Sequence, residues 1–131
     1  MKTINSLVVE DNEITLKMIQ NILKDYGPCE TAGDGLKGLE KVKQAAAGNI
    51  HFDLICLDIQ MPNSDGIELL ERIRLFEQEN QIDKKSIIIM VTVFGGPEII
   101  KKCVRLGCNS FLLKPVDKNN LSKVLKRHKI I

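Results

Sequence analysis

The feature that most constrains the fold is an alternation between short apolar runs and stretches with helical periodicity. Five runs are rich in apolar residues and end in polar residues or glycine. They span residues 7–9, 29–32, 53–57, 87–91 and 111–113, of which 29–32 is the weakest. After each run, apolar residues recur every three or four positions, which predicts helices near residues 13–26, 36–47, 66–77, 97–106 and 118–128.

This alternation predicts an α/β domain with parallel strands. The stronger runs are apolar throughout, which is typical of strands covered by helices on both faces of a sheet. We therefore expect a flavodoxin-like, doubly wound fold with a five-stranded parallel sheet, strand order 2-1-3-4-5 and five helices. The length of 131 residues fits a single domain over residues 1–131 and leaves little room for a separate output domain.

The overall charge and the apolar runs exclude several classes of protein. Lys and Arg number 19 and Asp and Glu 17, so the net charge of +2 favours neither nucleic acid nor a membrane surface as a partner. No run approaches the ~20 apolar residues that span a bilayer, and the N-terminal run is too short for a signal peptide. We expect a cytoplasmic protein.

The four cysteines, at positions 29, 56, 103 and 108, show no metal-site spacing. No pair forms C-x-x-C, and the chain has only two histidines. Cys56 lies inside an apolar run, as a buried and inert thiol would. We expect all four to be reduced and structural, and a redox role for the pair Cys103 and Cys108 stays open as the lesser alternative.

Polar residues stand where four of the five predicted strands end. Glu10 and Asp11 follow the first strand, Asp58 the third, Thr92 the fourth and Lys114 the fifth. In an open α/β sheet, ligands bind beyond the carboxyl ends of the strands, where the strand order reverses. Three converging carboxylates call for a hard divalent cation such as Mg²⁺, while a hydroxyl and an ammonium suit a phosphoryl group, which a carboxylate can accept.

These positions carry motifs that resemble response regulator receiver domains of two-component signalling, in particular the stand-alone type similar to the chemotaxis response regulator. The resemblance runs from about residue 4 to about residue 128. The matching segments are Val8-Val9-Glu10-Asp11, Leu57-Asp58-Ile59-Gln60-Met61-Pro62, Asp65-Gly66, Val91-Thr92 and Phe111-Leu112-Leu113-Lys114-Pro115. Five motifs in the correct order, each at a strand end, make a chance match improbable.

The resemblance implies a set of roles at the acidic strand ends. Asp58 would be the phosphoacceptor, taking a phosphoryl group from a phosphohistidine of a histidine kinase or histidine phosphotransfer protein. Asp11 and Asp58 would ligate Mg²⁺ directly together with the backbone carbonyl of Gln60, and Glu10 would act mostly through water. Glu10 stands where the family more often has Asp.

The resemblance also implies a switch on the later strands. Lys114 would pair with Asp58 and then with the phosphoryl group, and the bond before Pro115 would be cis. Thr92 would hydrogen-bond the phosphoryl group, and Phe111 would turn inward as Thr92 moves. The loop 93–97 would change conformation with them. These roles imply a phosphorylation-dependent switch that catalyses its own phosphorylation without conventional substrate turnover.

Several alternatives remain beside this interpretation. Gly33, Gly35 and Gly38 match the dinucleotide fingerprint G-x-G-x-x-G, but a tight turn before a helix explains them better. The scaffold could also serve as a phosphorylation-independent interaction module, which the intact set of site residues disfavours. Basic residues in the last two predicted helices form either a solvated face or a docking surface for a downstream protein: Lys101, Lys102, Arg105, Lys118, Lys123, Lys126, Arg127 and Lys129.

Three residues near the predicted site suggest a slow loss of the phosphoryl group. Val93 stands where the family usually has Ala or Gly, and its bulk would narrow access to the phosphoryl group. Phe94 and Gln60 occupy positions that flank the attacking water. We therefore expect slow self-dephosphorylation.

Overall fold

The computed structural model describes residues 3–61, 64–93 and 95–131. Its elements follow the predicted alternation, with one addition after the third strand. In chain order they are β1 (Ser6–Val9), α1 (Glu13–Leu23), β2 (Cys29–Ala32), α2 (Gly35–Ala47), β3 (Leu54–Asp58), β4 (Gln60–Met61), β5 (Ser64–Asp65), α3 (Gly66–Glu79), β6 (Ile87–Thr92), α4 (Pro97–Leu106), β7 (Ser110–Leu113) and α5 (Lys118–Arg127).

The main sheet confirms the predicted topology. Its strands lie in the order β2-β1-β3-β6-β7, and every neighbouring pair is parallel. Counted along the chain, these five strands have the order 2-1-3-4-5. β4 and β5 form a separate antiparallel hairpin between β3 and α3, where the sequence pattern predicted neither a strand nor a helix. The order along the chain reverses between β1 and β3, so this is where a ligand site is expected.

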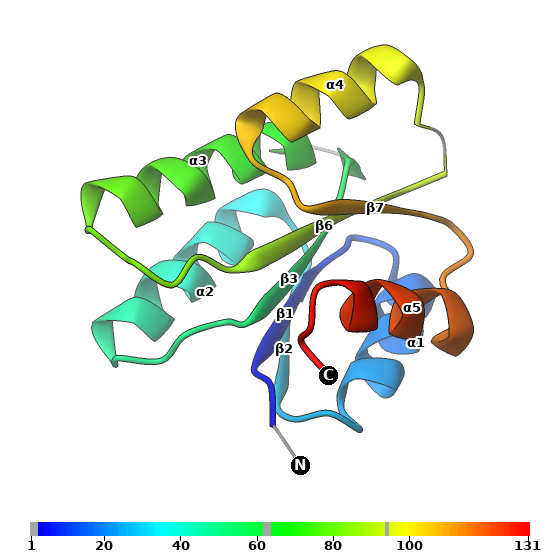
Figure 1. Ribbon diagram of the computed structural model, residues 1–131, viewed down its shortest axis with the longest axis horizontal. Coiled ribbons are helices and arrows are strands. Elements are labelled where there is room, and N and C mark those ends of the chain that lie inside the picture. The colour runs from blue at the N-terminus through cyan, green and yellow to red at the C-terminus, as the bar shows by residue number, and fades with distance from the viewer. Residues whose placement is uncertain (1–2, 62–63, 94) are drawn as a thin grey trace.

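Helices cover both faces of the sheet, as the continuous apolar strands predict. α1 and α5 lie on one face, and α2, α3 and α4 lie on the other (Figure 1). Successive strand residues alternate between the two cores because side chains alternate across a strand. Leu54 and Cys56 pack with α1 and α5, whereas Ile55 and Leu57 pack with α2 and α3. Each fully buried aliphatic side chain contributes about 1.5–3 kcal/mol through its removal from water.

Side-chain caps fix where the helices begin near the carboxyl edge of the sheet. Asn12 accepts a hydrogen bond from the backbone N–H of Thr15 and thereby caps α1. Asp34 caps α2 in the same way, through the N–H of Lys37. Such caps contribute about 1 kcal/mol each.

Of the three glycines that match the dinucleotide fingerprint, Gly33 precedes α2, whereas Gly35 and Gly38 lie within it. Gly35 begins α2 directly after its Asp34 cap. Gly38 lies one turn later, where an added Cβ would be 2.9 Å from the Val9 side chain. The segment therefore serves the close packing of a helix on the sheet.

A few side chains lie where the periodicity does not place them. Ile14 and Leu36 belong to the apolar pattern of the first two predicted helices, yet they are 73% and 70% exposed. Charged side chains usually lie on the exposed side of a helix, yet the Arg74 side chain is only 15% exposed and pairs with Glu77. No helix among the described residues is long and apolar enough to cross a membrane.

Candidate functional site

Three carboxylates converge at the carboxyl ends of β1 and β3. These strands are neighbours, and Val9 pairs with Leu57, so the residues that follow them emerge side by side. One oxygen from each of Glu10, Asp11 and Asp58 lies within 4.8 Å of the others. Glu10 is 2% exposed and Asp58 is 3% exposed, whereas Asp11 faces solvent.

Neither acidic residue after β1 is needed to cap α1. That function belongs to Asn12, whose own backbone N–H also donates to Oε2 of Glu10 at 3.2 Å. On the other strand, the backbone N–H of Gln60 donates to Oδ1 of Asp58 at 3.2 Å. The backbone thus orients both buried carboxylates, and helix capping does not explain the acidic pair.

Lys114 is the cation at this site. Its Nζ lies 2.7 Å from Oε1 of Glu10 and 3.4 Å from Oδ2 of Asp58, so it contacts Glu10 more closely than the expected partner, Asp58. The peptide bond to Pro115 is cis, as the resemblance implied. The backbone N–H of Lys114 donates to the carbonyl of Thr92 at 2.8 Å, which holds the end of β7 against the end of β6.

The pKa values of two groups at this site, the Asp58 carboxyl and the Lys114 ammonium, are raised by their surroundings. Burial raises the pKa of Asp58 to about 7, helped by the hydrogen bond and the charge of Glu10 and opposed by Lys114 and by the N–H of Gln60. Burial acts to lower the pKa of Lys114, but the hydrogen bond to Glu10 and the nearby carboxylates outweigh it and the pKa is raised. One ammonium therefore faces three carboxylates, which leaves an excess of negative charge.

Thr92 lies on β6, the strand next to Asp58, and Phe111 lies on β7, one strand further along the sheet. Thr92 ends β6 and is 1% exposed, and the preceding residue, Val91, pairs with Asp58. Phe111, in β7, pairs with Met90 of β6 and is partly buried against the core under α2, α3 and α4. The two therefore occupy adjacent strands, and their roles in a switch remain predictions.

The residues expected to control dephosphorylation are only partly described. The side chain of Val93 is 67% exposed directly after Thr92. Gln60 is also exposed, in β4. Phe94 lies outside the described residues.

Sequence reasoning treated Gly66 only as part of a motif, whereas the structure gives it a contact with the predicted phosphoacceptor. Gly66 is buried at the start of α3, and its N–H donates to the carbonyl of Ile59 at 3.1 Å. An added Cβ would lie 2.0 Å from the carbonyl oxygen of Asp58. An Asp-Gly pair just before a predicted helix signals a helix start, but it does not reveal what the glycine touches.

Comparisons with known proteins settle the family. The model of the response regulator receiver domain matches residues 6–126. The chain belongs to this family. This receiver domain is 37% identical over 123 residues to Chemotaxis protein CheY of Treponema pallidum, which covers 92% of this chain and 77% of that protein. It is 36% identical over 131 residues to Hybrid signal transduction histidine kinase B of Dictyostelium discoideum, covering 93% of this chain and 6% of that protein.

Solved structures show the same likeness in three dimensions. The CheX-CheY-BeF3-Mg+2 complex from Borrelia burgdorferi contains a chain that matches with a TM-score of 0.84 and 29% identity, covering 99% of this chain and 92% of that one. The receiver domain of the histidine kinase CKI1 from Arabidopsis thaliana, as a D1050A mutant, matches with a TM-score of 0.83 and 28% identity, covering 99% and 92%. The receiver domain is thus homologous to CheY and to the receivers of histidine kinases, as a phosphorelay switch would be.

Proposed function

We propose that this receiver domain is a phosphorylation-dependent switch of a two-component phosphorelay, with Asp58 as the phosphoacceptor. The observation that carries the proposal is the buried Asp58 carboxylate beside the Lys114 ammonium, inside a cluster with two further carboxylates. We propose that residues 1–131 form one such domain. Four free thiols fit a reducing compartment, and we assign the chain to the cytoplasm.

The acidic cluster fits a divalent cation. Two buried carboxylates and one exposed carboxylate, with their oxygens within 4.8 Å of one another, form an oxygen-only donor set that leaves room for water ligands. Asp11 and Asp58 would hold Mg²⁺ together with the carbonyl of Gln60, and Glu10 would contribute through water. Bound Mg²⁺ would neutralise the charge of the transferring phosphoryl group. The Borrelia burgdorferi complex named above includes Mg+2 and BeF3, which supports this choice.

The transfer itself makes one bond and breaks one. A carboxylate oxygen of Asp58 attacks the phosphorus of a phosphohistidine, the N–P bond breaks, and its electron pair stays on the imidazole nitrogen. The product is an acyl phosphate on Asp58 and a free histidine on the donor, a histidine kinase or histidine phosphotransfer protein. Lys114 compensates the phosphoryl charge, because its Nζ already lies 3.4 Å from Oδ2 of Asp58.

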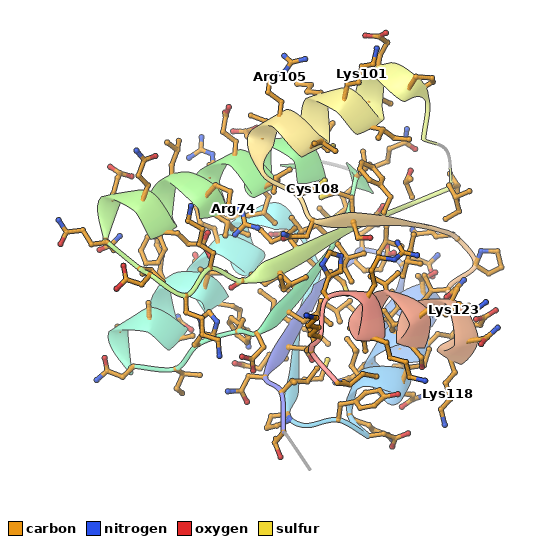
Figure 2. The ribbon with its side chains drawn as sticks, in the orientation of Figure 1. Arg74, Lys101, Arg105, Cys108, Lys118 and Lys123 are labelled. Atoms are coloured by element: carbon orange, nitrogen blue, oxygen red, sulfur yellow. The ribbon has the colours of Figure 1, made fainter. Side chains whose placement is uncertain are left out.

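Signalling then proceeds through the end of β6. The Thr92 hydroxyl would bind a phosphoryl oxygen, Phe111 would turn inward, and the loop 93–97 would follow. A downstream protein would dock on α4 and α5, where basic and apolar side chains are exposed. Figure 2 shows Lys101 and Arg105 on α4 and Lys118 and Lys123 on α5. Val104, on α4, is 59% exposed beside them.

Intact-mass measurement after incubation with acetyl phosphate and Mg²⁺ tests this function. We expect a gain of one phosphoryl group that disappears in Asp58→Asn and in EDTA. A chain that gains no mass is then offered a phosphorylated histidine kinase or phosphotransfer protein, because some receivers ignore small donors. Failure with both donors favours the phosphorylation-independent interaction module.

A further inference from the structure

The contact between Gly66 and Asp58 follows from the short connection between β3 and α3. After β3 ends at Asp58, the chain turns through the hairpin of β4 and β5, in which Gln60 pairs with Asp65, and α3 starts at the next residue. So short a return places the first residue of α3 directly against the peptide group that follows Asp58. The hydrogen bond from the Gly66 N–H to the Ile59 carbonyl, at 3.1 Å, closes this return.

There is no space for a side chain at position 66. An added Cβ would lie 2.0 Å from the carbonyl oxygen of Asp58 and 2.9 Å from both its carbonyl carbon and Cα of Ile59. All three are backbone atoms and cannot rotate away. Among the described glycines only Gly27 and Gly107 have positive φ, so the backbone of Gly66 suits any residue. In a helix Ala is favoured over Gly by about 1 kcal/mol, and the contact opposes that preference.

The peptide group that Gly66 contacts, between Asp58 and Ile59, is bonded to β6, because its N–H donates to the carbonyl of Val91 at 3.1 Å. The next peptide group supplies the N–H of Gln60, which donates to Oδ1 of Asp58 at 3.2 Å. A shift of this peptide therefore moves the carboxylate together with its backbone donor. Lys114 belongs to a different strand and would not follow.

We propose that Gly66 is a positioning residue for the phosphoacceptor. Because Gly66 has no side chain, the start of α3 packs directly against the backbone of Asp58, and this contact holds the Asp58 carboxylate at the acidic cluster. This rests on the function proposed above. Lengthening the 2.0 Å contact even to 3.0 Å requires the two backbone segments to separate by about 1 Å, and a misplacement of that size costs up to about 100-fold in rate. Gly66→Ala should therefore lower the rate of phosphorylation about 10- to 100-fold per folded chain.

Gly27→Ala is the matched control. A Cβ at Gly27 would also lie 2.0 Å from a backbone carbonyl oxygen, that of Ile4, and φ there is +151°, so this variant strains the fold at least as much. Gly27 precedes β2 at the amino edge of the sheet, away from the acidic cluster. Both variants and the wild type are labelled with acetyl phosphate and Mg²⁺ in sucrose, which favours the compact state, and rates are divided by the folded fraction from circular dichroism.

The expected result is a Gly27→Ala rate equal to that of the wild type and a Gly66→Ala rate at least tenfold lower. Equal rates in the two variants overturn the proposal. A wild type that takes no phosphoryl group from acetyl phosphate or from a histidine donor overturns the proposed function instead, so the two failures are distinguishable.

A second measurement on the wild type does not depend on the variant folding. If α3 is pressed on the Asp58 peptide, the amide hydrogens of Ile59 and Gly66 should exchange with solvent only through global unfolding. Exchange of the Gly66 amide at the rate of a freely opening loop would show that the start of α3 is detached from this peptide, and would refute the positioning role.

Discussion

Replacing Asp58 by Asn should stabilise the metal-free protein above neutral pH and leave its stability unchanged near pH 4. In the unfolded chain Asp58 loses its proton near pH 3.8, whereas the folded protein retains it until about pH 7. Between these values the folded state binds more protons, so the free energy of unfolding falls as the pH rises. The loss of stability caused by the ionised Asp58 carboxylate is absent below pH 3.8 and complete above about pH 7.

The size of the effect follows from the raised pKa. At about 1.36 kcal/mol per pH unit, a pKa of about 7 in place of 3.8 corresponds to an upper limit of about 4 kcal/mol. The repulsion acts between the Glu10 and Asp58 carboxylates, so it does not belong to Asp58 alone. The ammonium of Lys114 lies near both of them, at Oε1 of Glu10 and Oδ2 of Asp58, and partly compensates it. We therefore expect Asp58→Asn to gain about 2–4 kcal/mol over the wild type at pH 7.5.

Urea unfolding in EDTA at pH 4, 5.5 and 7.5 measures this difference directly. Asp83→Asn, an exposed aspartate in the loop before β6, is the control and should follow the wild type at each pH. Mg²⁺ at 100 times its dissociation constant should then stabilise the wild type by about 2.7 kcal/mol and Asp58→Asn by less. A wild-type advantage over Asp58→Asn at pH 7.5 in EDTA, or a difference that does not change with pH, would refute the reasoning.

Three further outcomes follow. Arg74→Met removes the hydrogen bonds to the Gly107 carbonyl and the Asn109 side chain, and it takes the ion-pair partner from the buried Glu77, which keeps the hydrogen bond from the Ser86 N–H. Urea unfolding should show a loss of about 3–5 kcal/mol. Arg72→Met, in an exposed ion pair, should cost under about 1 kcal/mol. Lys114→Met should slow labelling by acetyl phosphate about 100-fold, and an unchanged rate would exclude its electrostatic role. Val93→Ala should speed the decay of the phosphorylated form, measured by intact mass over time, with unchanged urea stability because the side chain is 67% exposed. Decay of the wild type within seconds would contradict slow dephosphorylation.

The sequence predicted the sheet and the location of the site for one physical reason. In a parallel sheet the carboxyl ends of the strands share an edge, so residues that follow apolar runs must gather there. Glu10 and Asp58 were assigned to that edge because each follows such a run, and the strand order that brings them together is confirmed.

Features that depend on packing between distant segments were not predictable in the same way. The β4–β5 hairpin consists of two-residue strands, too short for a periodicity to appear. Arg74 has a charged side chain in a helix, and only the fold shows that the carbonyl of Gly107 and the amide of Asn109 surround it. The closer approach of Lys114 to Glu10 than to Asp58 depends on side-chain geometry that spacing along the chain does not encode.

The measurement that tests the central claim most directly locates the phosphoryl group on the chain. After reaction with acetyl phosphate and Mg²⁺, borohydride reduces an acyl phosphate of aspartate to homoserine, and tandem mass spectrometry of the digest identifies the modified position. The account predicts homoserine at position 58 alone, and none when EDTA is present. Homoserine at another position, or at position 58 to the same extent in EDTA, would contradict it.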